Sequence, residues 1–289
     1  MQFNRSASIT IGPVAGQGIN VTRLRINFVV KKTNNKEPNE AEIKVYNLSR
    51  ASREELDKNL EAEEGAKVFL NAGYTEGEGE DVVFIGDVTK ISHTIDRPDI
   101  ITTIEAQDGQ KNLSSVDASL SFPTGTSART ILQTLLNLYP NKNDLANLVF
   151  PDISIQNGFS LAGLAQDGLD KITSLLGLDY SVQNDEIRLI PLNGSNGTLA
   201  ILLSATTGLI NSPERINDET EKSLGKSTVK NPGWRLTSLL QPKIIPGGRV
   251  AVTSEDISAN TIFTVVSVEH RGDTHVGEFN SITDVKDAA

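Results

Sequence analysis

The sequence predicts a mixed, β-rich fold, with antiparallel β-structure at both ends and an α+β region between them. Near both ends, apolar and polar residues alternate with the period of half-buried strands. In the middle, leucines recur at the spacing of one helix face. The change of period predicts that the chain folds as three different regions.

In the first third of the chain, the sequence pattern predicts strands that are interrupted by one helix. Apolar residues alternate with polar ones at Leu24–Val30 and again at Ala41–Val45. Ser52 stands three residues before Glu55, which is the spacing of a capping box. We therefore expect a short surface helix between Ser49 and Leu60.

Strand patterns resume after this helix. They lie at Val68–Leu70, Val82–Ile85, Val88–Ile95 and Ile100–Ala106. We expect a meander that closes on itself, because closure removes the free edges of a small barrel. The acidic, glycine-rich segment Thr75–Asp81 could be a cation site, but carboxylates on flexible backbone are more typical of a solvated hairpin loop.

Helices are predicted in the middle region. Thr126 is placed as the N-cap of a helix that stops at Pro140. Ser160 opens a second helix, which ends at Gly177. A hairpin that turns at Asn184 follows. The leucine stripes could bind partners, yet a helix in a compact domain must bury one face, and core packing is expected.

Strand patterns return in the last third. They lie at Leu199–Leu203, Trp234–Leu240, Val250–Thr253, Thr261–Glu269 and Glu278–Val285. Residues 211–231 are polar and charged, and we expect a long loop there. A segment of this kind can be an interface element that becomes ordered only on assembly.

The composition is typical of a soluble globular protein. Of 289 residues, 37% are hydrophobic and 22% are charged. No apolar run approaches the roughly 20 residues that a membrane-spanning helix needs. The absence of cysteine excludes thiol catalysis and cysteine-ligated metals. The N-terminus has no apolar signal segment, and we expect synthesis in the cytoplasm.

The formal net charge is −10 at pH 7. Sequence-independent affinity for nucleic acid comes from lysine and arginine that displace counterions, so the chain as a whole repels phosphate. We therefore expect no specific binding of nucleic acid. The same repulsion suits a surface past which DNA slides without sticking.

Two short motifs are similar to nucleotide-binding or catalytic signatures. Gly225-Lys226-Ser227 is similar to the end of a phosphate-binding loop, but Thr220 stands where a glycine is required. Ser223 and Lys226 have the spacing of some acyl-transfer enzymes, but the companion motifs are absent. We interpret both as chance matches.

His270, Asp273 and His275 are the clustered residues of metal-ligating type. Zinc needs three or four donors in fixed geometry. A metal at His270 and His275 is the alternative interpretation, but we expect these residues to shape a turn between two strands. Arg271-Gly272-Asp273 spells a cell-adhesion tripeptide, which we interpret as coincidence.

No arrangement of residues predicts catalysis. The 37 acidic residues are spread along the chain, without a Ser-His-Asp order or a glycine-flanked nucleophile. Three histidines, one methionine and one tryptophan leave little for a catalytic or cofactor site. We predict a protein that is not an enzyme and that holds no cofactor.

Several short strings follow one another along nearly the whole chain. They are Asn47-Leu48-Ser49, Ala72-Gly73-Tyr74, Phe84-x-Gly86-Asp87, Asp108-Gly109, Gly125-Thr126-Ser127, Gly208-Leu209-Ile210, Pro213, Trp234, Leu239-Leu240-Gln241-Pro242, Pro246-Gly247 with Val250, and His270-x-Gly272-Asp273-Thr274. In this order the strings resemble the baseplate (tail) hub proteins of contractile-tailed bacteriophages, a family grouped with late control protein D.

The resemblance implies an architecture and a structural role. It implies two tube-like antiparallel β-barrel domains, at residues 1–120 and 198–289, with a small α+β domain at residues 121–197 inserted between them. Three copies would form a homotrimer, and their six barrels a pseudo-hexameric ring. The ring would join the tail tube to the central spike around the DNA channel, and we expect its inner wall to be acidic or neutral.

The resemblance also implies the partners and the location. The partners would be other copies of the chain, the tail tube or tube-initiator protein, the central spike and other baseplate proteins, all in the virion and without membrane insertion. Other classes stay open. They are a distal tail or tube adaptor with true sixfold rings, a cell-wall-degrading enzyme with a perturbed carboxylate in a cleft, and a glycan-binding module with exposed aromatic residues.

Overall fold

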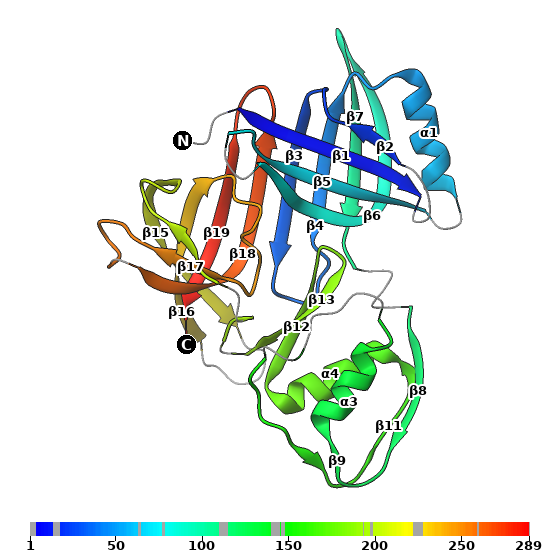
Figure 1. The fold of residues 1–289 in the computed structure, drawn as a ribbon, viewed down its shortest axis with the longest axis vertical. Helices are drawn as coiled ribbons and strands as arrows, with labels where there is room; N and C mark the ends of the chain where they lie inside the picture. The colour runs from blue at the N-terminus through cyan, green and yellow to red at the C-terminus, as the bar shows by residue number, and fades with distance from the viewer. Residues whose placement is uncertain are drawn as a thin grey trace.

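The structure is a computed structural model. It describes residues 4–13, 18–62, 65–76, 79–109, 115–139, 145, 148–192, 194–196, 199–221, 228–258 and 260–288, and for residues 217–221 and 228–232 it describes the backbone alone. We distinguish the N-terminal β region (residues 4–109), the middle region (115–196) and the C-terminal β region (199–288). Figure 1 shows the two β regions side by side, with the middle region below them.

Each region has its own set of elements. The N-terminal β region contains β1 (Arg5–Pro13), β2 (Ile19–Val21), β3 (Ile26–Thr33), β4 (Glu40–Tyr46), α1 (Arg50–Glu61), β5 (Ala66–Tyr74), β6 (Gly79–Asp96) and β7 (Asp99–Gln107). The middle region contains β8 (Asp117–Phe122), β9 (Thr126–Ser127), α3 (Ala128–Leu136), β10 (Ser154–Ile155), β11 (Phe159–Leu164), α4 (Ala165–Leu176), β12 (Leu178–Gln183) and β13 (Glu186–Pro191). The C-terminal β region contains β14 (Ile201–Leu203), β15 (Leu209–Glu221), β16 (Thr228–Leu239), β17 (Arg249–Val252), β18 (Thr261–Asp273) and β19 (Phe279–Asp287).

One large sheet runs through both β regions. Its strand order is β15-β16-β19-β18-β3-β4-β7-β6-β5-β1-β2, and β17 joins β14 to β18. The pairs are antiparallel except β14 with β17, which is parallel. The β-rich fold that the sequence predicts is confirmed. Among the described strands no pairing closes a barrel, and the two β regions share a sheet, so a pair of closed barrels stays a prediction.

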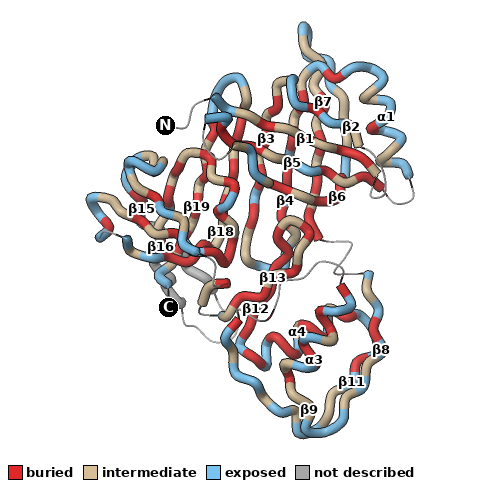
Figure 2. The backbone as a smooth tube through the Cα atoms, in the orientation of Figure 1, coloured by how far each residue is buried: buried red, intermediate tan, exposed pale blue. Residues whose placement is uncertain are grey.

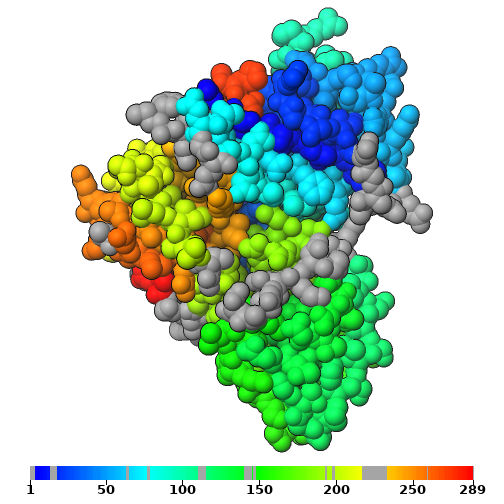
Figure 3. Space-filling view, in the orientation of Figure 1, coloured from blue at the N-terminus to red at the C-terminus, as the bar shows by residue number. Residues whose placement is uncertain are grey.

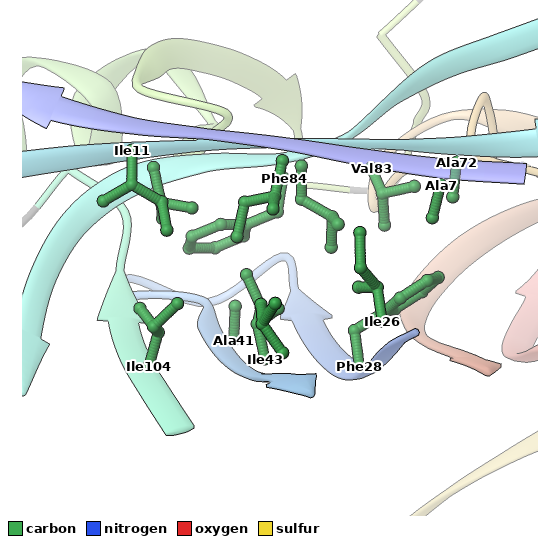
Figure 4. Packing of buried hydrophobic residues seen from close by; sticks show 14 of the residues in the cluster. Ala7, Ile11, Ile26, Phe28, Ala41, Ile43, Ala72, Val83, Phe84 and Ile104 are labelled. Carbon is green, nitrogen blue, oxygen red and sulfur yellow. The ribbon is translucent and has the colours of Figure 1, made fainter. Parts of the chain in front are cut away.

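The long strand β6 turns the sheet back over itself in the N-terminal β region. Its first half pairs with β5 and its second half pairs with β7, with register shifts on both sides. The layer of β1 and β5 therefore crosses the layer of β3, β4 and β7 (Figure 1). Figure 4 shows Ile11 of β1, Ala72 of β5 and Phe84 of β6 on one side of the core, with Ile43 of β4 and Ile104 of β7 on the other. All five side chains are buried in one apolar core.

Helix α1 forms where the sequence predicts it, but its cap is one turn earlier. The Ser49 side chain accepts a hydrogen bond from the Ser52 backbone N–H at 3.1 Å, so Ser49 is the N-cap and Ser52 lies inside the helix. The helix buries Leu56 and exposes its charged residues. The expected capping box of Ser52 and Glu55 is therefore wrong.

The helices of the middle region, in contrast, begin later than predicted. Ser127, and not Thr126, caps α3. Helix α4 begins at Ala165, because residues 159–164 form β11, which pairs with β8. It ends, as predicted, at Gly177 with φ +65°. The predicted hairpin is β12 with β13, and Asn184 turns it with φ +55°.

Helices cover little of the described chain. No helix among the described residues has both the length and the apolar character needed to cross a membrane.

The long loop expected at residues 211–231 is wrong. Leu209–Glu221 and Thr228–Leu239 are the two strands of a hairpin, and β16 also pairs with β19. Residues 222–227 lie outside the described residues. The strands of this hairpin are rich in polar and charged residues, so they lack the apolar alternation that marks a half-buried strand.

The two β regions meet where β3 pairs with β18, and we call this pairing the seam. Asn27–Thr33 lie opposite Ser267–Asp273 in antiparallel register. At one end of the seam, the Arg25 guanidinium binds the buried Asp273 carboxylate, with 2.7 Å between Nη2 and Oδ2. Burial raises the pKa of Asp273, but the hydrogen bonds from Arg25 and two backbone N–H groups outweigh it and lower the pKa to about 2.

Replacing Asp273 tests how strongly the seam depends on this pair. Asp273→Asn is expected to lower the free energy of unfolding by about 1–3 kcal/mol at pH 7, because it leaves a partly buried guanidinium without its counterion. Since the folded pKa lies below the unfolded one, this stabilisation is present above about pH 4 and is lost as the pH falls towards 2. Urea unfolding at several pH values measures it.

Glu54→Gln is the control for this experiment. Glu54 binds Arg50 at 2.7 Å on the exposed side of α1, where ion pairs contribute little. We expect a much smaller change in the free energy of unfolding than for Asp273→Asn. A loss for Asp273→Asn that is equally large at pH 7 and at about pH 2 would contradict the role of its charge.

Candidate channel-facing surface

Strand alternation gives the shared sheet two faces of different chemistry. On β3, Ile26, Phe28 and Val30 are fully buried, whereas Val29 and Lys31 point to the opposite side. The neighbouring strands β4, β18 and β19 show the same alternation. The period of two therefore places one set of side chains in the core and the other set on an outward face.

Charged residues from both β regions gather on this outward face, which we call the polar face. They are Lys90 on β6, Glu105 on β7, Glu40, Glu42 and Lys44 on β4, Lys31 on β3, Glu269 and Arg271 on β18, Asp284 on β19, and Arg235 on β16. Glu40, Lys31 and Glu269 lie opposite one another on adjacent strands. The polar face thus continues across the seam.

Four of the five cations named on the polar face bind carboxylates of the same face. The pairs are Lys44–Glu42 at 2.7 Å, Lys90–Glu105 at 2.6 Å, Arg235–Asp284 at 2.8 Å and Arg271–Glu269 at 2.8 Å. Partly exposed pairs of this kind stabilise a fold by about 1 kcal/mol or less. Their main effect is to neutralise these four lysine and arginine side chains where they stand, so the four pairs present little free positive charge to a polyanion.

A shallow hollow of about 310 Å³ lies on the polar face over β3, β4, β6 and β7. Lys31, Glu40, Glu42 and Glu105 are among its lining residues. Glu42 and Glu105 lie directly opposite each other on paired strands, where two like charges repel. Of the four charged residues that line the hollow, three are carboxylates.

His270 lies on the other side of β18, in the core, where it is fully buried. Its Nδ1 is 2.8 Å from the Ser281 hydroxyl, and its Nε2 is 3.2 Å from the Ile244 carbonyl oxygen. Burial, together with the nearby Lys32 ammonium, lowers the pKa of His270 to about 3, so the ring is neutral at physiological pH. The expectation that His270 shapes a turn is wrong, because it lies within a strand.

Asp273 does shape the turn that follows β18. Its Oδ1 accepts hydrogen bonds from the backbone N–H groups of His275 and Val276, at 2.9 and 3.1 Å. Arg271 binds Glu269 and Asp273 is buried, so the tripeptide at 271–273 is held inside the sheet. In the described part of the chain, no three metal-ligating side chains gather into a possible metal site.

The two short motifs cannot be placed as sites. Ser223 and Gly225-Lys226-Ser227 lie outside the described residues, and Thr220 lies in β15. The sequence did contain the charged residues of the polar face, as alternating charges at Glu40, Glu42 and Lys44. That these residues form one surface with the C-terminal β region was missed.

Residues 8–180 match the family model of the baseplate hub gp41. The matched stretch is more than half of the chain. The chain belongs to the baseplate hub gp41 family. The resemblance to phage baseplate hub proteins that the short strings carry is thereby confirmed. No curated protein gives a significant match to the sequence.

Solved structures share the fold of this hub-family chain. A tail protein from Neisseria meningitidis MC58 has a TM-score of 0.60 and 11% identity, over 99% of this chain and 97% of its own. The 43 kDa tail protein of prophage MuSo2 from Shewanella oneidensis has a TM-score of 0.61 and 8% identity, over 99% and 98%. A component of the type VI secretion system of E. coli has a TM-score of 0.57 and 9% identity, over 96% and 77%. At these identities the likeness is one of fold.

Proposed function

We propose that this chain is a structural subunit of a phage baseplate hub, where three copies form a ring with pseudo-sixfold symmetry around the DNA channel. The observation that carries the proposal is the polar face, which continues through both β regions and on which four of the five named cations are paired with carboxylates. The inner wall of a ring is one surface repeated around the axis. In this chain each of the two β regions contributes one part of the polar face, so three copies would contribute six parts. The ring would join the tail tube to the central spike in the virion.

The arrangement of apolar cores supports two tube-like β domains with an α+β domain between them. Separate apolar clusters centre on the N-terminal β region, the middle region and the C-terminal β region. From these centres we infer domains at residues 1–120, 121–197 and 198–289, although the N-terminal cluster also contains Leu240 and Phe279 and the middle cluster contains Ala118. In the assembled ring, strands of neighbouring copies would cover edges that are open in the single chain.

The charge of the polar face supports a channel that DNA passes without binding. DNA binds a protein wall by replacing counterions with lysine and arginine. At the four cations that already have a carboxylate at 2.6–2.8 Å, the exchange of counterions for DNA phosphates gains little free energy. A wall of this kind confines the duplex and lets it slide.

The partners proposed here also have support from structural neighbours. The E. coli protein is described as similar in structure to the T4 bacteriophage tail proteins gp27 and gp5. Another neighbour, with a TM-score of 0.57, is a Francisella complex of PdpA with VgrG. By analogy, this chain contacts the spike and the tail tube and has an assembly role without catalysis.

The oligomeric state tests the ring. At high protein concentration, light scattering is expected to give three times the 31.2 kDa mass of the chain. A stable ring interface buries well over about 1,000 Å², so the trimer should persist on dilution. A monomer or a true hexamer at every concentration, and in reconstituted baseplates, would contradict the proposal.

Charge-neutralising variants test the channel surface. Glu42→Gln combined with Glu105→Gln removes the carboxylate partners of Lys44 and Lys90. We expect the variant to bind a short DNA duplex about fivefold to tenfold more tightly than the unmodified chain at low salt, because the two lysines can then displace counterions. Fluorescence anisotropy of a labelled duplex, repeated over a salt series, measures the change.

A matched pair on α1 is the control. Glu54→Gln combined with Glu55→Gln removes the same charge from an exposed helix outside the polar face. We expect a smaller gain in affinity for this control. Tight binding of DNA by the unmodified chain at physiological salt, or an equal gain for both variants, would remove the proposed mechanism.

A further inference from the structure

The turn of the β12–β13 hairpin reaches from the middle region up to the N-terminal β region (Figure 1). Figure 2 shows both strands of this hairpin as largely buried, and Figure 3 shows the rest of the middle region as a lobe of its own. The position of the lobe relative to the N-terminal β region therefore depends on the contacts of this hairpin.

The hairpin turn binds three polar residues of the N-terminal β region. The Asn184 amide oxygen accepts from Lys32 Nζ at 2.7 Å, and the Asn184 backbone N–H donates to the Asp108 carboxylate at 3.0 Å. The Asn39 side chain donates to the Val182 carbonyl oxygen at 2.8 Å and to Asp108 at 2.9 Å. We call this set of contacts the latch.

Two further contacts lie beside the latch. The Gln183 side chain donates to the Thr33 carbonyl oxygen at 2.7 Å, and Lys67 binds Asp185. Lys32, Asn39, Asp108, Gln183 and Asp185 are all buried. The turn is thus held by buried polar groups on both sides.

The apolar cores, in contrast, do not join the two regions. The cluster of the middle region consists of residues between Val116 and Leu189. The cluster of the N-terminal β region contains no residue of the middle region. Interfaces within a chain that are polar and lack a common core allow relative motion of the parts.

The latch is favourable only when it is complete. A buried donor, acceptor or charge that loses its partner is strongly destabilised. Burial lowers the pKa of Lys32 to about 8 and raises the pKa of Asp108 to about 6, so in the closed position both charges are less well solvated than in water. The positive charge of Arg188 contributes to the lowered pKa of Lys32, and the neutral His270 ring also lies near the Lys32 ammonium. Partly broken arrangements of the latch leave buried groups without partners. The middle region therefore favours two discrete positions, one with the latch closed and one with it fully released.

A second support lies at the other end of the hairpin. There the Asn196 backbone N–H donates to the Gly247 carbonyl oxygen at 2.9 Å. A Cβ atom at Gly247, which has φ +78°, would lie 2.4 Å from Cδ1 of Ile190, so the Ile190 side chain packs directly against the Gly247 backbone. This contact ties the middle region to the C-terminal β region and leaves a pivot when the latch is open.

We propose that the middle region is a movable body, which the latch holds against the N-terminal β region and which pivots near Gly247 when the latch opens. This inference goes beyond the proposed function and does not depend on it. The two β regions keep their common sheet in both positions. The chain therefore contains a conformational switch that leaves the polar face unchanged.

Spin-label distance measurements on the isolated chain test the switch. Because the chain has no cysteine, Lys58→Cys and Ser174→Cys place the labels at two exposed positions only, one on α1 and one on α4. With an intact latch we expect one narrow distance distribution. Asn39→Ala combined with Asn184→Gly removes side-chain contacts from both sides of the latch, and we expect the ratio of released to closed molecules to rise by about tenfold or more.

Two further variants keep the result interpretable. Asn184→Gly alone suits the positive φ at this position, so it should fold even if the double variant does not, and it should show a smaller shift in the same direction. Lys36→Ala removes the exposed pair with Asp170, at 2.6 Å between the same two regions, and should leave the distribution unchanged. A folded latch variant with the original narrow distribution, or an equal effect of Lys36→Ala, would overturn the proposal.

Discussion

The register of the seam between β3 and β18 is the constraint on which the rest of the structure depends. Because side chains alternate with a period of two, a slip of one residue would move Lys31 into the core and Phe28 into solvent. Gly272 fixes the register by packing, since a Cβ atom there would lie 2.3 Å from the Phe28 ring. Arg25 and Asp273 fix it by charge. Both the common core and the continuous polar face follow from this register.

Much of the secondary structure could be predicted, because the alternation of a strand and the end signals of a helix each lie within a short stretch of sequence. Alternation located β4 and β7, a cap-type serine located α1, and Gly177 located the end of α4. The start of α1 was misplaced because Ser49 and Ser52 can both cap a helix, and the choice depends on where β4 ends. The strand pattern at Trp234–Leu240 located the second half of β16, but most of β15 and the first half of β16 were missed, since residues 211–231 carry too few apolar residues to alternate.

The candidate sites could be predicted only in part, because they depend on contacts between distant residues. Glu40 and Glu42 look like the outer residues of one strand, and nothing in the sequence shows that Glu269 lies on the same surface. Asn39 and Asp108 each resemble ordinary turn residues. Their burial beside the β12–β13 turn arises from the placement of the middle region, which no local pattern encodes.

The two joints of the molecule differ in their physical basis, and this difference suggests a division of roles. The seam combines a backbone hydrogen-bond ladder with a common apolar side, so it can open only at the expense of the fold. The latch consists of buried polar contacts, whose partners can be replaced by water. Lys32 belongs to both joints, because it lies in β3 and binds Asn184. When the middle region leaves, the Lys32 ammonium must be hydrated or find another acceptor, and the rate of release should therefore depend on how easily water reaches the end of β3.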